Sequence, residues 1–206
     1  MSKSDYNIRS ISKIECTDLL QKHHYLTGLS RGFKSGDNYG LMYPDEEVDF
    51  FKTNKAPDKV VGVCIFTCLP VPELAKGMFG LDRDDQDGFY ELSRLVLHPD
   101  HQASEHNLAG WFVARAIKEL KENNNVRAIL SYADNDYHSG TVYKALGFDY
   151  YGLTDVKTDF WIKQDDDTYI KHSRGPTKHL EGEWRPRSRK HRFLKVFDES
   201  LEVKWT

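Results

Sequence analysis

The stretch that decides the fold is SYADNDYHSGTVYKALGFDYYG, residues 131–152. It begins at the end of an apolar run, AILSY, which is typical of a buried strand. Polar residues follow, and then SGTVYKALG predicts a short helix that ends at Gly147, because glycine readily adopts the left-handed conformation found after helices. The stretch therefore indicates a strand, a polar loop and a short helix, with candidate functional residues at the join.

The neighbouring segments extend this alternation. FYELSRLVLHP, residues 89–99, predicts a strand that is ended by a proline. ASEHNLAGWFVARAIKELKENNN, residues 103–125, has apolar residues at steps of three and four, so it predicts the main helix, with Ser104 as its N-cap. After residue 147, FDYYGLT and TDFWIK predict aromatic strands. The order from residue 89 is strand, helix, strand, helix, strand.

The first half of the chain carries weaker signals. DKVVGVCIFTCLPV, residues 58–71, predicts a buried strand because it is apolar and β-branched. CTDLLQKHHYL, residues 16–26, predicts a short helix with Thr17 as its N-cap. LAKGMFGLDRDDQDG, residues 74–88, combines glycines with acids, and we expect it to be an exposed connection.

The charge of the chain is unevenly distributed. The net charge is −3 over 206 residues, yet residues 171–195 contain nine Lys or Arg against two Glu. Such a segment indicates a polyanionic partner, double-stranded DNA first, or else a solvated tail. The length suits one compact domain. We expect a catalytic domain over residues 1–165 and a basic C-terminal extension over residues 166–206, packed on or next to it.

The cysteines and the apolar runs indicate a soluble cytoplasmic protein. Cys16, Cys64 and Cys68 lack metal-ligand spacing, and we expect them to be buried thiols in a reducing compartment. No segment approaches the roughly 20 apolar residues of a membrane span, and the N-terminus has no apolar signal region.

Residues 89–148 resemble the GNAT superfamily of N-acetyltransferases. Tyr143, Gly147 and Phe148 match its Tyr-x-x-x-Gly-Phe signature. The resemblance implies an α/β (mixed α+β) fold, with a central, mixed but mostly antiparallel sheet flanked by helices. It also implies that acetyl-CoA or a related small-group donor binds where a strand ends and the next helix begins. The residues at that place are Leu95, Val96, Leu97, Ser104, Glu105, His106 and Asn107.

A narrower resemblance is carried by five segments in order: KHHYLTG, ELSRLVL, SYADNDYHSGTVYKALGFDYYGLT, IKHSRG and RKHRFLK. In this order they are similar to the phage Mom family of diverged, acetyltransferase-like proteins that modify adenines in phage DNA. The resemblance implies conversion of adenine N6 to a carbamoylmethyl-type adduct, which protects phage DNA from host restriction. Two alternatives stay open: an ordinary N-acetyltransferase for a small amine or a protein lysine, and a non-catalytic DNA-binding anti-restriction protein.

Polar residues around the opening stretch are the catalytic candidates. Asp134 directly follows a strand, where its carboxylate can accept from an exocyclic amine or act as a general base, unless it only forms an Asx turn or caps a helix. The GNAT resemblance implies that Tyr143 protonates a departing thiolate, the alternative being a core contact. Ser131 and His138 are expected to face the same cleft, where His138 can shuttle a proton. Arg94 interrupts an apolar strand, so it needs an acid, a phosphate or the site itself.

Two further groups are candidates for binding. His23, His24 and Tyr25 could form an iron or other metal site together with Asp134, although paired histidines at a helix end usually face solvent. Phosphate contacts to DNA are predicted for a set of basic residues. That set is Arg31, Lys34, Arg174, Arg185, Arg187, Arg189, Lys190 and Arg192.

Overall fold

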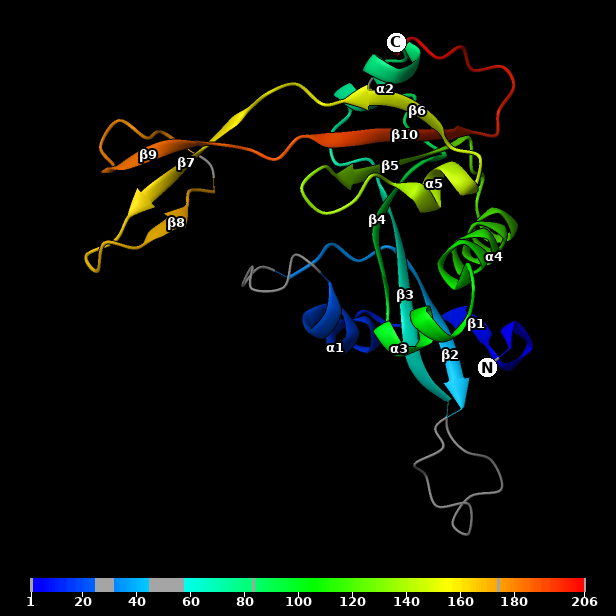
Figure 1. Cartoon of the computed structure of the whole chain (residues 1–206). Helices are drawn as coiled ribbons and strands as arrows, with labels where there is room; N and C mark the ends of the chain where they lie inside the picture. Colours follow the sequence, from blue (N-terminus) through cyan, green and yellow to red (C-terminus); the bar gives the residue numbers. More distant parts are fainter. Residues whose placement is uncertain (1, 25–31, 45–57, 83, 174, 206) are drawn as a thin grey trace.

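The computed structural model describes residues 2–24, 32–44, 58–82, 84–173 and 175–205 and contains two sheets (Figure 1). The main sheet has seven strands in the order β1-β2-β3-β4-β5-β10-β6, and the small sheet has the order β8-β7-β9. All neighbouring strands are antiparallel except β4 and β5. The predicted fold class, a mostly antiparallel mixed sheet flanked by helices, is confirmed.

The strands of the main sheet are β1 (Asn7–Ser10), β2 (Asp37–Pro44), β3 (Asp58–Cys68), β4 (Phe89–Leu97), β5 (Ala128–Asp134), β6 (Asp149–Leu153) and β10 (Lys190–Val196). Those of the small sheet are β7 (Thr158–Lys163), β8 (Tyr169–Lys171) and β9 (Gly182–Pro186). The helices are a short 3-10 turn (Lys3–Asp5), α1 (Lys13–His23), α2 (Glu73–Phe79), α3 (Pro99–Ser104), α4 (Leu108–Asn123) and α5 (Thr141–Ala145).

Helices cover the two faces of the main sheet unequally. On one face, α4 and α5 pack over β2 to β5 and β10, with Phe112, Leu120 and Phe193 in the core. On the other face, α1 covers β2 to β4 through Leu19 and Leu20. At the other end of that second face, α2 lies over β4, β5 and β10. A part of the second face therefore lies between α1 and α2, and it carries polar side chains.

The main helix forms where predicted, but its start differs. Ser104 ends α3 and donates through Oγ to the His101 carbonyl (3.1 Å), so it does not cap α4. The residue before α4 is Asn107, whose φ of 55° lies in the left-handed region. Its carboxamide lies over Gly110, where an added Cβ would come within 2.4 Å of Oδ1. A glycine at 110 is what allows this entry into the helix.

Three smaller expectations were wrong. α1 is capped by Ser12, not Thr17, because Ser12 and Glu15 form a reciprocal capping box. The expected exposed connection contains α2, with Met78 and Phe79 buried, since Gly80 (φ 74°) serves as a helix C-cap. Cys68 lies at the exposed end of β3, whereas the other two thiols are buried.

Among the described residues, no helix combines the length and the apolar character that a membrane crossing requires.

The parallel strands β4 and β5 pair over only part of their length. Phe89–Leu92 pairs with Ala128–Ser131, after which β4 continues along β3 and β5 continues along β10. At the last shared rung Ser131 Oγ donates to the Leu92 carbonyl (3.1 Å), and Ser93 forms a bulge in β4. Beyond Leu92 and Ser131 the two strands are no longer paired with each other. We call the space between these unpaired parts of β4 and β5 the wedge.

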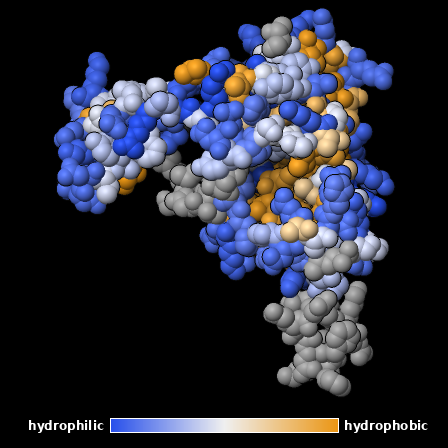
Figure 2. Space-filling view, viewed as in Figure 1, coloured by the Kyte–Doolittle hydropathy of each residue, from blue (hydrophilic) through white to orange (hydrophobic). Residues whose placement is uncertain are grey.

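The segment expected as a C-terminal extension divides into two parts. β10 pairs with both β5 and β6 inside the main sheet, and Phe193 and Leu194 on it are fully buried. The small sheet, residues 158–186, is a β-arm that projects from the ends of β6 and β10 (Figure 1). Figure 2 shows the β-arm as a separate, largely hydrophilic lobe joined to the main body through a narrow neck.

Candidate functional site

The polar part of the sheet between α1 and α2 is the candidate site. Asp134 pairs with Lys190 and Tyr132 pairs with Arg192 across β5 and β10, so all four side chains point to one face. Leu130, two residues before Tyr132, packs with α2, which identifies that face as the one that α1 and α2 cover. The site lies at the mouth of the wedge.

Asp134 is held in a fixed position at the end of β5. It is 8% exposed, and its Oδ1 accepts hydrogen bonds from Ser188 Oγ and from the Asp136 amide (3.1 Å). Its carbonyl accepts from the amides of Tyr137 and His138, both at 3.0 Å. The predicted Asx-type turn is thus present, and it orients the carboxylate. Nothing in the local sequence linked Ser188 to Asp134, because the two meet only through the pairing of β10 with β5.

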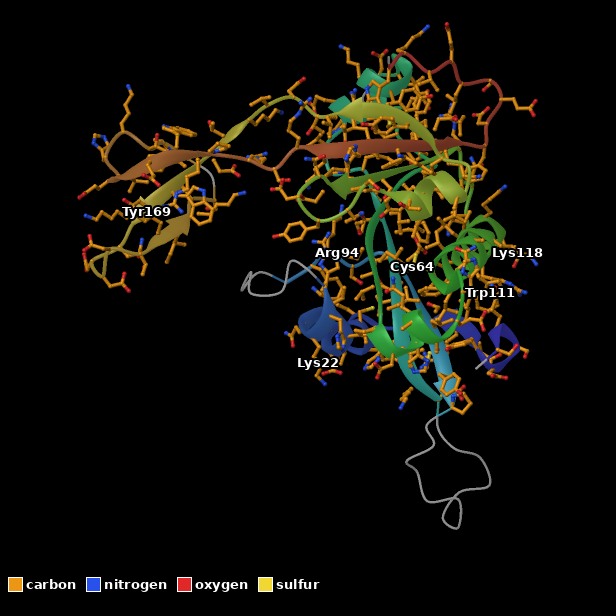
Figure 3. All side chains as sticks on the ribbon, in the orientation of Figure 1. Lys22, Cys64, Arg94, Trp111, Lys118 and Tyr169 are labelled. Carbon is orange, nitrogen blue, oxygen red and sulfur yellow. The ribbon has the colours of Figure 1, made fainter. Side chains whose placement is uncertain are left out.

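Arg94, His24 and His138 come together from three elements. Arg94 lies on β4 on the side that faces away from α4 (Figure 3), and its Nη1 donates to the Ser93 carbonyl (2.6 Å). His24 directly follows α1 and is 7% exposed. Burial, and then the positive charges of Arg94 and His138, lower the pKa of His24 to about 4. His24 is therefore a neutral imidazole at physiological pH.

His138 lies between two charged neighbours. Desolvation lowers its pKa, the Asp134 carboxylate opposes that shift, and His191 adds to it. Electrostatic coupling thus links His24 to His138 and His138 to Asp134. Four of the predicted residues, Asp134, Arg94, His24 and His138, belong to one cluster.

The lowered pKa of His24 predicts a pH-dependent stability. Below its ordinary pKa of 6.5 the unfolded chain protonates this imidazole, whereas the folded protein does not until about pH 4. Stability is therefore full above pH 6.5 and falls toward pH 4, by up to about 3 kcal/mol from this group. Urea titrations at several pH values should show this slope, and His24→Gln should flatten it. An unchanged slope in His24→Gln, with His23→Gln as the control, would exclude His24 as its origin.

Glu91 and Tyr132 form the floor of the site between β4 and β5. Burial raises the pKa of Glu91, opposed by the nearby charges of Lys190, Arg94 and Lys34. Burial, and then the Glu91 carboxylate, raise the pKa of Tyr132 to about 12. The Lys190 ammonium lies 5.8 Å from the centre of the Tyr132 ring. A half-buried carboxylate among cations can accept hydrogen bonds from an amino group. Glu91 was not among the site residues predicted from the sequence.

Tyr143 and Ser131 lie on the face of the main sheet that α4 and α5 cover, opposite the face that carries Asp134. Tyr143 is 6% exposed, with ring centroids 5.3 Å from Phe193 and 5.8 Å from Phe148. The Tyr143 ring is therefore part of the hydrophobic core. Its role as a general acid stays a prediction. Ser131 is fully buried and its hydroxyl bonds to Leu92, so it fixes the apex of the wedge.

The profile of the Mom protein family matches residues 5–204, nearly the whole chain. The chain belongs to the Mom protein family. A search of curated protein sequences finds no match. The cluster around Asp134 and the wedge are therefore features of a Mom family member.

Solved structures similar to this Mom family member are acetyltransferases. Arabidopsis thaliana NAA60 in complex with acetyl-CoA has a TM-score of 0.54 at 8% identity, covering 93% of this chain and 99% of that one. An acetyltransferase of Salmonella typhimurium with its cofactor acetyl-CoA has a TM-score of 0.50 at 12% identity, covering 95% of each chain. The Escherichia coli ribosomal-protein-S18-alanine N-acetyltransferase has a TM-score of 0.50 at 12% identity, covering 94% of each. These similarities show that the Mom family member has the GNAT fold.

The predicted donor residues of this Mom family member lie at the end of β4 and in the segment before α4. Leu95, Val96 and Leu97 lie on β4 beyond its pairing with β5. Glu105, His106 and Asn107 lead into α4, where no described side chain caps the helix and the first turn has no acidic residue. Uncapped amides at a helix start suit an anion such as a pyrophosphate. The loop has no glycine, but Asn107 adopts the left-handed backbone that a glycine would otherwise supply.

The metal candidates are separated from one another. The His23 ring meets the His98 ring edge-on, with centroids 4.8 Å apart, and both residues line a cavity of about 620 Å³. His24 instead faces Arg94 and His138, and Tyr25 lies outside the described residues. No group of three His, Cys, Asp or Glu in the described part of the chain is arranged to hold a metal ion.

The predicted phosphate-binding cations of the Mom family member do not form one group. In the β-arm, Arg187 pairs with Asp159 and Arg185 pairs with Glu183, so their charges are partly neutralised. Lys190 and Arg192 face the site beside Tyr132. Arg189 supports the neck of the β-arm through a bond to the Thr154 carbonyl (2.7 Å), and Lys34 is exposed and acts electrostatically on Glu91. Arg31 and Arg174 lie outside the described residues.

Proposed function

We propose that this chain is a transferase that modifies adenine N6 in double-stranded DNA with a small, carbamoylmethyl-type group. The observation that carries the proposal is the placement of Asp134 at the mouth of the wedge, on a face lined by Lys190, Arg192 and Arg94. Membership of the Mom protein family supports it. The protein would act on phage DNA in the host cytoplasm and protect it from restriction.

Asp134 would act as the general base of the reaction. The lone pair of an adenine N6 amine is delocalised into the ring, so the amine becomes nucleophilic only as it loses a proton. The Asp134 carboxylate, which accepts from Ser188 and from the Asp136 amide, would take that proton. Asp134 would remove the N6 proton as the bond from N6 to the transferred carbon forms and the bond from that carbon to the leaving group of the donor breaks.

The donor side of the wedge would hold a small-group donor related to acetyl-CoA that already carries the amide nitrogen of the transferred group, because acetyl-CoA itself would give an N6-acetyl adduct. Leu95–Leu97 would supply strand backbone along the donor, and the start of α4 at Leu108 would face its phosphates. A bound donor would supply an activated group and a leaving group that accepts a proton. We propose the hydroxyl of Tyr143 as the source of that proton, as in the GNAT signature.

The acceptor face would bind a nucleotide taken out of the duplex. A base inside a stacked duplex cannot bring N6 to a buried carboxylate, so the base must be extruded. The Tyr132 ring offers an aromatic surface on the floor, and Glu91 can accept a hydrogen bond from an amino group. Lys190 and Arg192, which point to the same face as Asp134, would contact the flanking phosphates.

Nucleoside mass spectrometry tests the proposal directly. Plasmid DNA from cells that express the protein should contain a modified deoxyadenosine, and plasmid from cells with the empty vector should not. Normal adenosine profiles from a soluble, folded protein would overturn the proposed function. Restriction digestion of the same plasmids gives a second readout, because a modified adenine should block cleavage.

An ordinary N-acetyltransferase is the second candidate, because one of the similar structures is the Escherichia coli ribosomal-protein-S18-alanine N-acetyltransferase. It predicts turnover of acetyl-CoA with an amine, without dependence on DNA. The polar face with Lys190 and Arg192 favours the DNA substrate instead. Thiol release measured with and without duplex DNA separates the two candidates.

A further inference from the structure

The β-arm ends in an exposed strand edge. The small sheet has the order β8-β7-β9, so β9 pairs with β7 on one side and with no described strand on the other. The β-arm stands clear of the main body (Figure 1), and every residue of β9 except Arg185 is exposed. An accessible edge of this kind is a place where a further strand can add to a sheet.

The backbone of Trp184, in the middle of β9, points away from β7. The Lys163 amide donates to the Glu181 carbonyl (2.9 Å), and the Arg187 amide donates to the Lys157 carbonyl (2.8 Å). Hydrogen-bonded pairs alternate along an antiparallel ladder, so the odd-numbered residues of this segment bond to β7. The backbone groups of the even-numbered residues, Trp184 among them, therefore point outward.

The charges along this edge have opposite signs on the two sides of Trp184. The sequence of residues 181–187 is EGEWRPR, with Glu181 and Glu183 before the tryptophan and Arg185 and Arg187 after it. If two copies of this segment pair antiparallel with Trp184 opposite Trp184, each glutamate lies directly opposite an arginine of the other copy. Opposite charges that face each other across a strand pair stabilise the pair. The segment is therefore complementary to itself.

Other pairings of the same edge are disfavoured. Parallel pairing in register places glutamate against glutamate and arginine against arginine. Antiparallel pairing centred on Glu183 or on Arg185 puts like charges at the centre, and the backbone groups of both residues are already bonded to β7. In the pairing centred on Trp184, Pro186 lies opposite Gly182 of the other copy, whose amide can donate to the Pro186 carbonyl. The missing N–H of Pro186 is therefore tolerated there.

We propose that β9 pairs with β9 of a second copy of this chain, so that the two β-arms form one continuous sheet. The two Trp184 side chains, each 60% exposed in the single chain, lie side by side in the joined sheet, and each packs on its own Phe160 (ring centroids 5.3 Å apart). Glu183 and Arg185 already contact each other within one copy (2.5 Å), so the charges of both copies form one network. Because the paired strands are antiparallel, the two main bodies lie at opposite ends of the joined sheet and do not collide.

The composition of the β-arm fits a second copy better than a polyanion. Residues 158–186 contain five Lys or Arg against six Asp or Glu, so the β-arm is close to neutral. Pairing over residues 181–187 buries less than the about 800 Å² per partner of a standard interface, so we expect a reversible dimer with a dissociation constant of about 1–100 μM. The inference is independent of the reaction that the candidate site performs.

Analytical ultracentrifugation of the full chain over a range of concentrations tests the pairing. Glu183→Lys and Arg185→Glu should each raise the dissociation constant of the dimer at least about 10-fold, because each creates two facing pairs of like charge. An equimolar mixture of the two variants should dimerise about as well as wild type, since the introduced lysine then faces the introduced glutamate. Glu199→Lys, which makes the same charge change at an exposed residue outside the β-arm, is the control and should dimerise normally.

Recovery of the dimer in the mixture is the decisive result, because variants that had merely misfolded could not restore each other. A wild-type protein that stays monomeric up to about 1 mM overturns the proposal and leaves this edge to a strand of another protein. A wild-type dimer that neither substitution weakens forms through a different surface, which also overturns it. If both substitutions weaken the dimer and the mixture does not recover it, the pairing centred on Trp184 is wrong.

Discussion

An Asp134→Asn variant is expected to lose adenine modification almost completely. Asparagine keeps an oxygen for Ser188 Oγ and for the Asp136 amide, so the turn after β5 should persist. The carboxamide cannot take a proton from an amine, and loss of a general base lowers rates by about 100-fold to 10,000-fold. The measurement is the fraction of modified deoxyadenosine in plasmid DNA, together with resistance to restriction.

The control for this variant is Asp136→Asn. Asp136 lies in the same loop and is exposed, and it bonds to Asp134 through its backbone amide, which the substitution leaves in place. Thermal unfolding of both variants should match that of wild type. If Asp134→Asn modifies DNA at the wild-type rate, the general base lies elsewhere, and Glu91 on the floor of the site becomes the first alternative.

A Phe193→Ala variant is expected to lose about 3–5 kcal/mol of unfolding free energy. Phe193 is fully buried, and its ring lies 5.3 Å from those of Tyr143 and Tyr150. It also packs under the turn before α5, where Gly140 has a φ of 73° and an added Cβ would come within 2.3 Å of the ring. Truncation therefore leaves a cavity where β10, α5 and β6 meet. Urea denaturation measures the loss.

Trp184→Ala is the matched control for Phe193→Ala. It removes an even larger aromatic side chain from the same C-terminal region, but that side chain is 60% exposed. We expect it to cost less than about 1 kcal/mol, as for other surface substitutions. Equal losses in the two variants would contradict the assignment of β10 to the core of the main sheet.

The parts of the fold that sequence reasoning predicted are those with local signals. The alternation of β4, α4, β5 and α5 follows from apolar periodicity and from Gly147, and each of these elements is present. α2 escaped prediction because its glycines resemble loop signals, although Gly80 ends a helix. The strand character of residues 190–196 also escaped prediction, because KHRFLKV alternates imperfectly and its partners lie far away in the sequence.

The same distinction applies to the candidate site. Asp134 stands out in the sequence because it directly follows an apolar strand, Arg94 because it interrupts one, and His138 because it is close to Asp134. The structure brings the three residues into one cluster with His24. Ser188 could not be found in this way, because it reaches Asp134 only when β10 lies beside β5. The roles of these residues in catalysis stay predictions that the variants above test.

The position of β10 between β5 and β6 also bears on how the protein is made. During translation β5 and β6 leave the ribosome long before residues 190–196 are made. Until β10 has been synthesised, the edges of β5 and β6 that will pair with it therefore have no partner strand. Exposed edges of this kind pair readily with other chains. We expect nascent chains that stall before residue 190 to aggregate or to be degraded, and the carboxylate at residue 134 to reach its final position only when synthesis is almost finished.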